Sequence, residues 1–230
     1  MVVKEIIHKH LSYTSIPEFF DGEYWPSQIW YCLRKQYYSR ISPIPMSLES
    51  KKFTTLGTII HEFIAETLKK EESVRVESEV PIRIPHPNRH DVVISGRADD
   101  IIIVTVGKSR YVVEVKTIDD LESKRSYLPK KEHIAQLNLY LRAYPNSKGI
   151  ILYVDRGSFE MEEFEISFNP DLFNETIKRV EMLHDYLIKR ELPPPEAKEN
   201  QDMKWQCDFC EYRAKCEKQI SSNNNNNNKK

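Results

Sequence analysis

The pattern of apolar and polar positions predicts a β-hairpin near the middle of the chain. Residues 101–104 are apolar and β-branched, residues 111–115 are nearly so, and Gly107 lies in the short connection between the two runs. Such runs favour strands, and a short connection makes them antiparallel neighbours in a sheet. Because side chains alternate between the two faces of a strand, Glu114 and Lys116 are expected on the same face.

Spacing elsewhere predicts further helices and strands around this hairpin. Apolar residues that recur at i, i+3, i+4 and i+7 indicate helices with one apolar face, and strict alternation indicates half-buried strands. No element is predicted for the weakly patterned residues 1–20, whereas a helix predicted over residues 29–40 contains Cys32. The remaining predicted elements are helices over 53–72, 130–143 and 170–190 and strands over 74–84, 149–155 and 164–168.

The composition is that of a globular protein with one main core. The 230 residues are 40% hydrophobic and 30% charged, which is enough apolar material to bury a full core. There is no run of about 18 apolar residues and no leader-like N-terminus, so we expect a cytoplasmic protein without a membrane span. The formal net charge of -1 gives no overall signal for nucleic-acid binding, so any such surface must be local.

Shifts in composition divide the chain into four parts. Residues 1–50 are expected to form an N-terminal helical segment, and residues 51–192 form the core and a long helix. Residues 193–220, which begin with three prolines, form a separate C-terminal segment rich in cysteine. Residues 221–230 are rich in asparagine and are expected to be a disordered tail, because they cannot build a core.

Glu114 and Lys116 are candidate functional residues because unpaired charge is costly to bury on an apolar strand. Asp99, at the start of the partner strand, could supply a second carboxylate to the same face. Two carboxylates and a lysine would make an oxygen-ligand site for Mg²⁺ or Mn²⁺, with the lysine beside the attacking water. The alternative is a solvent-exposed cross-strand pair. His61, at the edge of an apolar helical face, is either a packed or capping histidine or a metal ligand.

Two segments combine side chains that suit a nucleic acid. Residues 29–40 interleave aromatic and basic residues, as single-stranded nucleic acid would require, although core packing explains the aromatic residues equally well. Residues 119–131 leave the end of the Glu114 strand and are rich in lysine and arginine. They are either a phosphate-binding connection or a merely solvated loop.

The four cysteines indicate a metal centre rather than a disulfide framework. Cys207, Cys210 and Cys216 form a tight three-ligand set, and the fourth cysteine is the distant Cys32. Four thiolates can close a zinc site or hold an iron–sulfur cluster, and the spacing does not separate the two; unliganded thiols are the third alternative. A single centre would fasten the C-terminal segment to the N-terminal helix.

The order helix, strand, strand, strand, helix, strand over residues 53–155 resembles the core of the PD-(D/E)xK nuclease superfamily. Its motif positions are filled in sequence by His61, Gly96-x-x-Asp99, Glu114-Val115-Lys116 and Gln136-x-x-x-Tyr140. The glutamine–tyrosine helix resembles the RecB-like branch. One cysteine before this core and three after it resemble RecB-like nucleases with an iron–sulfur staple, and most of all the CRISPR-associated Cas-four exonucleases.

This resemblance implies an α/β, restriction-endonuclease-like fold: a central mixed sheet flanked by helices, with a Cys-ligated iron–sulfur lobe that joins the N- and C-terminal segments. It also implies a role for each motif residue. The Gly-x-x-Asp spacing favours Asp99 over its neighbour Asp100. A divalent Mn²⁺ or Mg²⁺ would be held by His61, Asp99, Glu114 and the backbone carbonyl of Val115. Lys116 would orient the attacking water, Gln136 and Tyr140 would position the DNA, and Cys32, Cys207, Cys210 and Cys216 would hold a cluster, with [4Fe-4S] favoured.

The resemblance further implies a metal-dependent exonuclease that acts on single-stranded DNA ends and processes DNA for CRISPR spacer acquisition. Cas integrase proteins would be its partners, and self-association is left open. The family more often has a proline after the first cysteine, where this chain has Leu33; the departure leaves the four cysteines intact. Two alternatives remain: a DNA-binding or scaffold subunit of a spacer-integration complex, and a recombination or repair nuclease outside CRISPR.

Overall fold

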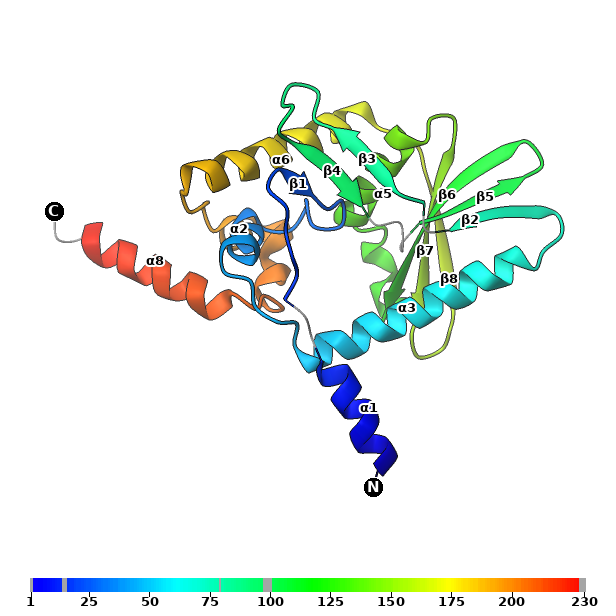
Figure 1. Cartoon of the computed structure of the whole chain (residues 1–230), viewed down its shortest axis with the longest axis horizontal. Helices are drawn as coiled ribbons and strands as arrows, with labels where there is room; N and C mark the ends of the chain where they lie inside the picture. The colour runs from blue at the N-terminus through cyan, green and yellow to red at the C-terminus, as the bar shows by residue number, and fades with distance from the viewer. Residues whose placement is uncertain (1, 14–15, 79, 97–100, 228–230) are drawn as a thin grey trace.

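A five-stranded mixed sheet forms the centre of the structure (Figure 1), a computed structural model that describes residues 2–13, 16–78, 80–96 and 101–227. The strand order is β2-β5-β6-β7-β8. β6 and β7 run parallel, and the other neighbouring strands run antiparallel. The strands are β2 (Val74–Ser78), β5 (Ile101–Val106), β6 (Ser109–Ile118), β7 (Lys148–Asp155) and β8 (Met161–Ile166).

Helices cover both faces of this sheet. α3 (Leu48–Lys69) packs on the face that carries Val113 and Val115. α5 (Lys131–Ala143) packs on the opposite face, and α6 (Pro170–Lys189) packs in turn against α5. The predicted helices over 53–72, 130–143 and 170–190 are confirmed as α3, α5 and α6, apart from a few residues at their ends.

Gly149 on β7 allows the close approach of α5 to the sheet. A Cβ atom at this position would lie 2.8 Å from the carbonyl oxygen of Ile166 and 2.9 Å from Cδ2 of Leu137. Both distances are shorter than an ordinary van der Waals contact, so a larger residue would force the helix or β8 to move.

A smaller sheet corrects the prediction of one strand over residues 74–84. Its order is β1 (Glu23–Tyr24), β4 (Val93–Gly96) and β3 (Ile82–Pro85). The predicted strand is therefore two strands, β2 and β3, which belong to different sheets. Pro81 precedes β3 and cannot donate to a strand ladder, which explains why the alternation of apolar residues continues while the pairing does not.

The predicted helix over 29–40 begins later than expected. α2 (Leu33–Ile41) starts after Cys32, so Cys32 is the N-cap residue and does not lie inside the helix. The carbonyls of Ile29 and Tyr31 accept hydrogen bonds from the side chain of Gln36 at 3.2 and 2.7 Å, and from Arg179 at 3.2 and 3.1 Å. Because side chains satisfy these carbonyls, the backbone before Cys32 has no need of helical hydrogen bonds.

The two ends of the chain also differ from the predictions. α1 (Val2–Ser12) lies within the expected N-terminal helical segment, at residues whose spacing predicted no individual element, and projects from the body of the molecule (Figure 1). α8 (Arg213–Asn227) continues into the asparagine tract that was expected to be a disordered tail.

Short helices complete the structure: α4 (Leu121–Lys124), η2 (Arg125–Tyr127), α7 (Glu196–Glu199) and η3 (Gln201–Cys207). Among the described residues, no helix combines the length and apolar character that crossing a membrane would require.

Candidate functional site

The predicted hairpin is confirmed as β5 and β6. The two strands pair antiparallel from Ile101↔Glu114 to Val106↔Ser109, and Gly107 turns between them with a positive φ of 59°. Glu114 and Lys116 lie on the face that α5 covers, whereas Val113 and Val115 pack toward α3. The backbone thus presents both charged side chains to the α5 side of the sheet.

Lys116, which is partly exposed, forms an ion pair with the buried Glu114. The Glu114 side chain is 0% exposed, and Lys116 Nζ lies 2.5 Å from its Oε1 atom. The alternative of a solvent-exposed cross-strand pair is therefore wrong. Burying a carboxylate at this depth costs free energy unless positive charge compensates it, and Lys116 supplies that charge.

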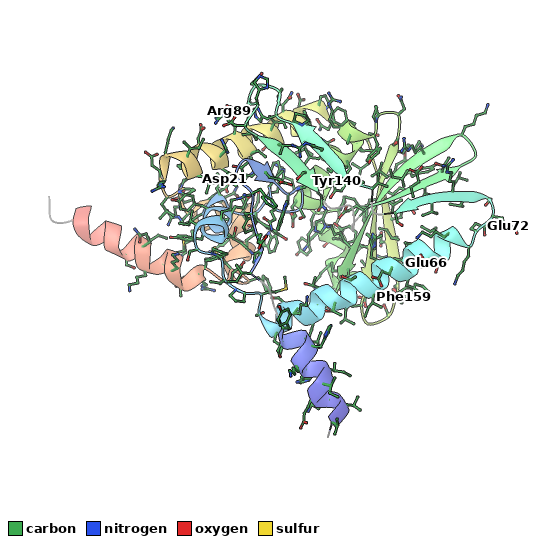
Figure 2. The ribbon with its side chains drawn as sticks, in the orientation of Figure 1. Asp21, Glu66, Glu72, Arg89, Tyr140 and Phe159 are labelled. Atoms are coloured by element: carbon green, nitrogen blue, oxygen red, sulfur yellow. The ribbon has the colours of Figure 1, made fainter. Side chains whose placement is uncertain are left out.

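Gln136 and Tyr140 extend this pair into a hydrogen-bonded chain of four residues. Lys116 Nζ donates to Gln136 Oε1 at 3.1 Å, and Gln136 Nε2 donates to the Tyr140 hydroxyl at 2.8 Å. Both α5 side chains are buried, and Tyr140 lies near the middle of the molecule (Figure 2). Their spacing of four residues places them on the same side of the helix, as the sequence predicted.

His133 and Tyr153 lie beside this chain, and the sequence analysis missed them. Tyr153 on β7 is the register partner of Lys116, and its hydroxyl lies 2.7 Å from His133 Nδ1. The same hydroxyl accepts a hydrogen bond from the Lys130 backbone N–H at 3.1 Å. Burial, together with the nearby charges of Lys116 and Lys130, lowers the pKa of His133 from 6.5 to about 2. One available signal was that His133 precedes Gln136 by three residues on the same helix.

The remaining expected metal ligands are placed differently. Asp99 and its rival Asp100 lie outside the described residues, which resume with Ile101 opposite Glu114. Val115 is buried in β6 beside Glu114. His61 is half-buried on α3, whose residues Ile60 and Ile64 pack on the valine face of the sheet. Its role as a ligand stays a prediction.

The chemistry of the site suits a hard divalent cation. Glu114 supplies a buried carboxylate, which is the ligand type that Mg²⁺ and Mn²⁺ prefer, and the backbone carbonyl of Val115 is a second oxygen of the same kind. Within the described ranges, no three or more His, Cys, Asp or Glu side chains are grouped so as to hold a metal ion.

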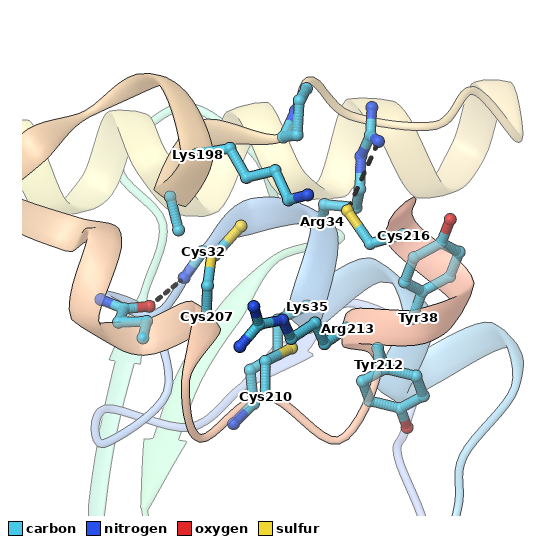
Figure 3. A pocket seen from close by; sticks show the side chains of 13 residues that line it. Cys32, Arg34, Lys35, Tyr38, Lys198, Cys207, Cys210, Tyr212, Arg213 and Cys216 are labelled. Atoms are coloured by element: carbon cyan, nitrogen blue, oxygen red, sulfur yellow. Dashed lines mark hydrogen bonds between the residues drawn. The ribbon is translucent and has the colours of Figure 1, made fainter. Parts of the chain in front are cut away.

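All four cysteines line one pocket between the N- and C-terminal segments (Figure 3). Cys32 comes from the start of α2, Cys207 from the end of η3, Cys210 from the turn that follows, and Cys216 from α8. Burial raises the pKa of the Cys207 and Cys210 thiols, and Cys32 is close enough to both to raise them further. The structure thus brings together the four residues that the sequence grouped.

Hydrogen bonds fasten the two segments to each other around this pocket. The Cys32 backbone N–H donates to Gln206 Oε1 at 2.8 Å, and Arg34 Nε donates to the Pro193 carbonyl at 2.7 Å. Arg34 also lies 3.7 Å from the Cys216 sulfur. The C-terminal segment is therefore held against the N-terminal one, as the cysteine pattern predicted.

Most of the aromatic residues of the 29–40 segment pack in the core. Tyr31 is half-buried, whereas Trp30, Tyr37 and Tyr38 are buried. For these three rings the interpretation as stacking surfaces for nucleic acid is wrong and the core-packing alternative is correct. Three cations lie over these rings: Lys131 and Arg179 over Trp30, and Lys215 over Tyr38.

Comparison with known proteins identifies the family of this chain. A model of the PD-(D/E)XK nuclease superfamily matches residues 36–217. The CRISPR-associated exonuclease Cas4 of Saccharolobus solfataricus is 27% identical over 218 residues, which cover 94% of this chain and 95% of that protein. The resemblance expected from the motifs is therefore confirmed.

Two solved structures share the fold. The crystal structure of SSO0001 superposes with a TM-score of 0.62 at 22% identity and covers 92% of this chain and 91% of its own. The alkaline exonuclease of Laribacter hongkongensis superposes with a TM-score of 0.50 at 16% identity, over 74% of this chain and 90% of its own. Both likenesses concern the arrangement of the elements.

Proposed function

Because this chain belongs to the PD-(D/E)XK nuclease superfamily, we propose that it is a metal-dependent exonuclease that hydrolyses DNA from single-stranded ends. The observation that carries this proposal is the buried chain Glu114–Lys116–Gln136–Tyr140, built on the motif positions of that family. Its charged end is enclosed by the sheet and α5, as a site for charged intermediates requires.

The family resemblance gives the roles of the metal ligands, and the observed contacts give the role of Lys116. Glu114 would hold a divalent Mn²⁺ or Mg²⁺ together with Asp99, His61 and the Val115 carbonyl. When bound, that cation would supply positive charge for activating water and stabilising the scissile phosphate. Lys116, held between Glu114 and Gln136, orients the attacking water and offsets the charge that develops on the phosphate.

Gln136 and Tyr140 position Lys116 as well as the DNA strand. The Gln136 amide accepts from Lys116 through its oxygen and donates to Tyr140 through its nitrogen, so its orientation is fixed at both ends. A fixed amide leaves the Lys116 ammonium little freedom to turn away from the site. Substitution of either α5 residue should therefore lower activity even where DNA still binds.

We propose that the four-cysteine pocket holds an iron–sulfur cluster, with [4Fe-4S] favoured. Four thiols from two chain segments line one pocket, which is the donor set of such clusters. Four thiolates would also bind a single zinc ion, and the resemblance to nucleases with an iron–sulfur staple is what favours the cluster. The cluster would fasten segments that already share the Cys32–Gln206 and Arg34–Pro193 hydrogen bonds.

The similarity to a CRISPR-associated exonuclease over 94% of the chain supports a role in preparing DNA for spacer acquisition, with Cas integrase proteins as partners. In that role the enzyme would trim ends before integration. The competing proposal, a scaffold subunit that binds DNA ends without cutting, predicts binding without hydrolysis under the same conditions.

Digestion of single-stranded DNA labelled separately at each end tests the proposal. Anaerobically purified protein should release label with Mn²⁺ or Mg²⁺ and none with EDTA. Glu114→Gln, which keeps the shape of the side chain and removes its charge, should bind DNA and keep its visible absorbance yet fail to cut. Hydrolysis by Glu114→Gln at the wild-type rate would refute the site, and binding without hydrolysis by the wild type would favour the scaffold.

A further inference from the structure

Arg34 is a buried cation beside the four-cysteine pocket. It follows Cys32 by two residues on α2 and is only 6% exposed. Arg34 Nε donates to the Pro193 carbonyl at 2.7 Å, and Arg34 Nη1 donates to the Cys216 sulfur at 3.7 Å (Figure 3). Within the described part of the chain, no aspartate or glutamate forms an ion pair with this guanidinium. Because arginine stays protonated in proteins, its positive charge is present at every working pH.

The other three cations that line the pocket already have carboxylate partners. Each of them lies between 3.0 and 3.2 Å from a carboxylate oxygen, and each is more exposed than Arg34. The pairs are Lys35 with Glu211, Lys198 with Glu217, and Arg213 with Asp208 and Glu217. Among the described residues of this pocket, Arg34 is therefore the cation whose charge lacks a carboxylate to compensate it.

A buried positive charge costs free energy unless a negative charge lies close to it. We propose that Arg34 is the counter-ion of an anionic metal–thiolate group held by the four cysteines. In the proposed iron–sulfur cluster, this charge should also raise the reduction potential. The inference rests on the proposed cluster and adds to it the residue that balances its charge.

The charge of the bound group supports this assignment. Four thiolates carry twice the charge of one zinc ion, so a zinc site of this kind is anionic, and a cluster with four cysteine ligands is anionic as well. The Cys216 sulfur, which accepts from Arg34, belongs to this donor set. Arg34 therefore meets the negative charge of the group at one of its ligands.

Reduction of a cluster adds one electron and makes the group more negative. A fixed positive charge nearby favours the more negative state, and the reduction potential of such clusters depends on net charge and on hydrogen bonds to the sulfurs. Arg34 supplies both at Cys216. Removal of its charge should therefore lower the potential.

The hydrogen bond to Pro193 gives Arg34 a structural role that must be separated from its charge. That bond joins the N- and C-terminal segments whether or not a group is bound. Arg34→Gln removes the charge and keeps an N–H that can donate to the Pro193 carbonyl. Arg34→Lys keeps the charge but lacks the planar guanidinium that bonds two acceptors at once. The two variants thus divide the charge from the hydrogen-bond geometry.

Redox titration of anaerobically purified protein measures the charge effect. The visible absorbance is followed while dithionite is added with mediators, for the wild type, Arg34→Gln, Arg34→Lys and Arg213→Gln. Arg213→Gln is the matched control, because Arg213 lines the same pocket but its side chain is 52% exposed and already paired. The same substitution thus removes a buried, uncompensated charge in one variant and an exposed, compensated charge in the other.

Arg34→Gln should lower the equilibrium constant for reduction by about tenfold or more, which corresponds to about 59 mV for one electron. Arg34→Lys and Arg213→Gln should stay within about threefold of the wild type, the latter because an exposed, paired charge is screened. A wild-type potential in Arg34→Gln, a loss in Arg34→Lys as large as in Arg34→Gln, or an equal loss in Arg213→Gln would overturn the assignment. If Arg34→Gln did not fold, Arg34→Lys would still decide, because a potential far from the wild type contradicts a role for the charge.

Metal retention tests the counter-ion whichever metal is bound. Each protein is incubated with increasing EDTA without air, and the retained iron or zinc is measured. Arg34→Gln should release half of its metal at an EDTA concentration about tenfold lower than the other three proteins require. Equal retention by all four would overturn the counter-ion. A colourless wild type with stoichiometric zinc would refute the proposed cluster, and the tenfold difference in zinc retention would then leave the counter-ion standing.

Discussion

The lowered pKa of the partly buried His133 makes the stability of the protein depend on pH in a way that one substitution removes. Burial, Lys116 and Lys130 lower the pKa of His133 from 6.5 to about 2 in the folded state. In the unfolded state the ring returns to its ordinary pKa and binds a proton below about pH 6.5. Below about pH 6.5 the His133 ring therefore binds a proton in the unfolded state but not in the folded state. The free energy of unfolding has its full value above this pH and falls as the pH decreases.

The size of this effect follows from the fraction of unfolded chains that bind the proton. At about pH 5.5, roughly ten of every eleven unfolded chains carry a proton on His133. This protonation lowers the free energy of unfolding by about 1.4 kcal/mol. At about pH 7.5 the same contribution is below about 0.1 kcal/mol. Because the folded pKa lies far below both values, its own precise position does not alter the difference.

Urea denaturation at these two pH values measures the effect. His133→Gln removes the titrating ring and keeps a side chain that can bond the Tyr153 hydroxyl. It should lose about 1.4 kcal/mol less stability than the wild type on going from about pH 7.5 to about pH 5.5. His90→Gln is the control, because it removes an exposed histidine in place of His133.

The other histidines contribute to both the wild type and the variant, so they cancel in this comparison. Equal losses of stability in the wild type and in His133→Gln would refute the neutral state of His133. If His90→Gln reduced the loss of stability between the two pH values as much as His133→Gln does, the effect would not arise from the His133–Tyr153 pair.

Three further predictions concern other parts of the molecule. Gly149→Ala should lower the free energy of unfolding by about 1–3 kcal/mol, since its Cβ would meet the Ile166 carbonyl; a melting temperature equal to the wild type would contradict this packing. Tyr140→Phe should cost about 1–3 kcal/mol, because the buried Gln136 amide loses its hydroxyl partner, and unfolding curves that superpose would argue against that contact. Cys216→Ala should reduce the visible absorbance and iron content of anaerobically purified protein, whereas a colourless wild type with stoichiometric zinc would exclude the cluster.

The sequence predicted the parts of the site that depend on local spacing. Alternation placed Glu114 and Lys116 on one face, and a spacing of four placed Gln136 and Tyr140 on one side of α5. These relations hold within a single strand or helix, so they require no knowledge of the tertiary structure. The sequence also grouped the four cysteines correctly, since all four line one pocket. The chain has no further cysteine with which Cys32 could be grouped.

What the sequence could not predict depends on contacts between distant segments. The alternation across residues 74–84 has the same period on both sides of Pro81, so it does not reveal that β2 and β3 join different sheets. Likewise, the late start of α2 follows from Arg179, which bonds the carbonyls before Cys32 from 150 residues away along the chain. The meeting of His133 and Tyr153 arises only when α5 packs across β7.

Single-turnover cleavage of end-labelled, single-stranded DNA tests the central assignment most directly. The comparison is between Lys116→Ala and Lys108→Ala, because Lys108 is an exposed lysine in the turn of the same hairpin. With Mn²⁺ and saturating protein, Lys108→Ala should cut at the wild-type rate, whereas Lys116→Ala should be slower by about a hundredfold or more while it still binds the DNA. Cleavage by Lys116→Ala at the wild-type rate would contradict the account, because Lys116 would then have no part in hydrolysis.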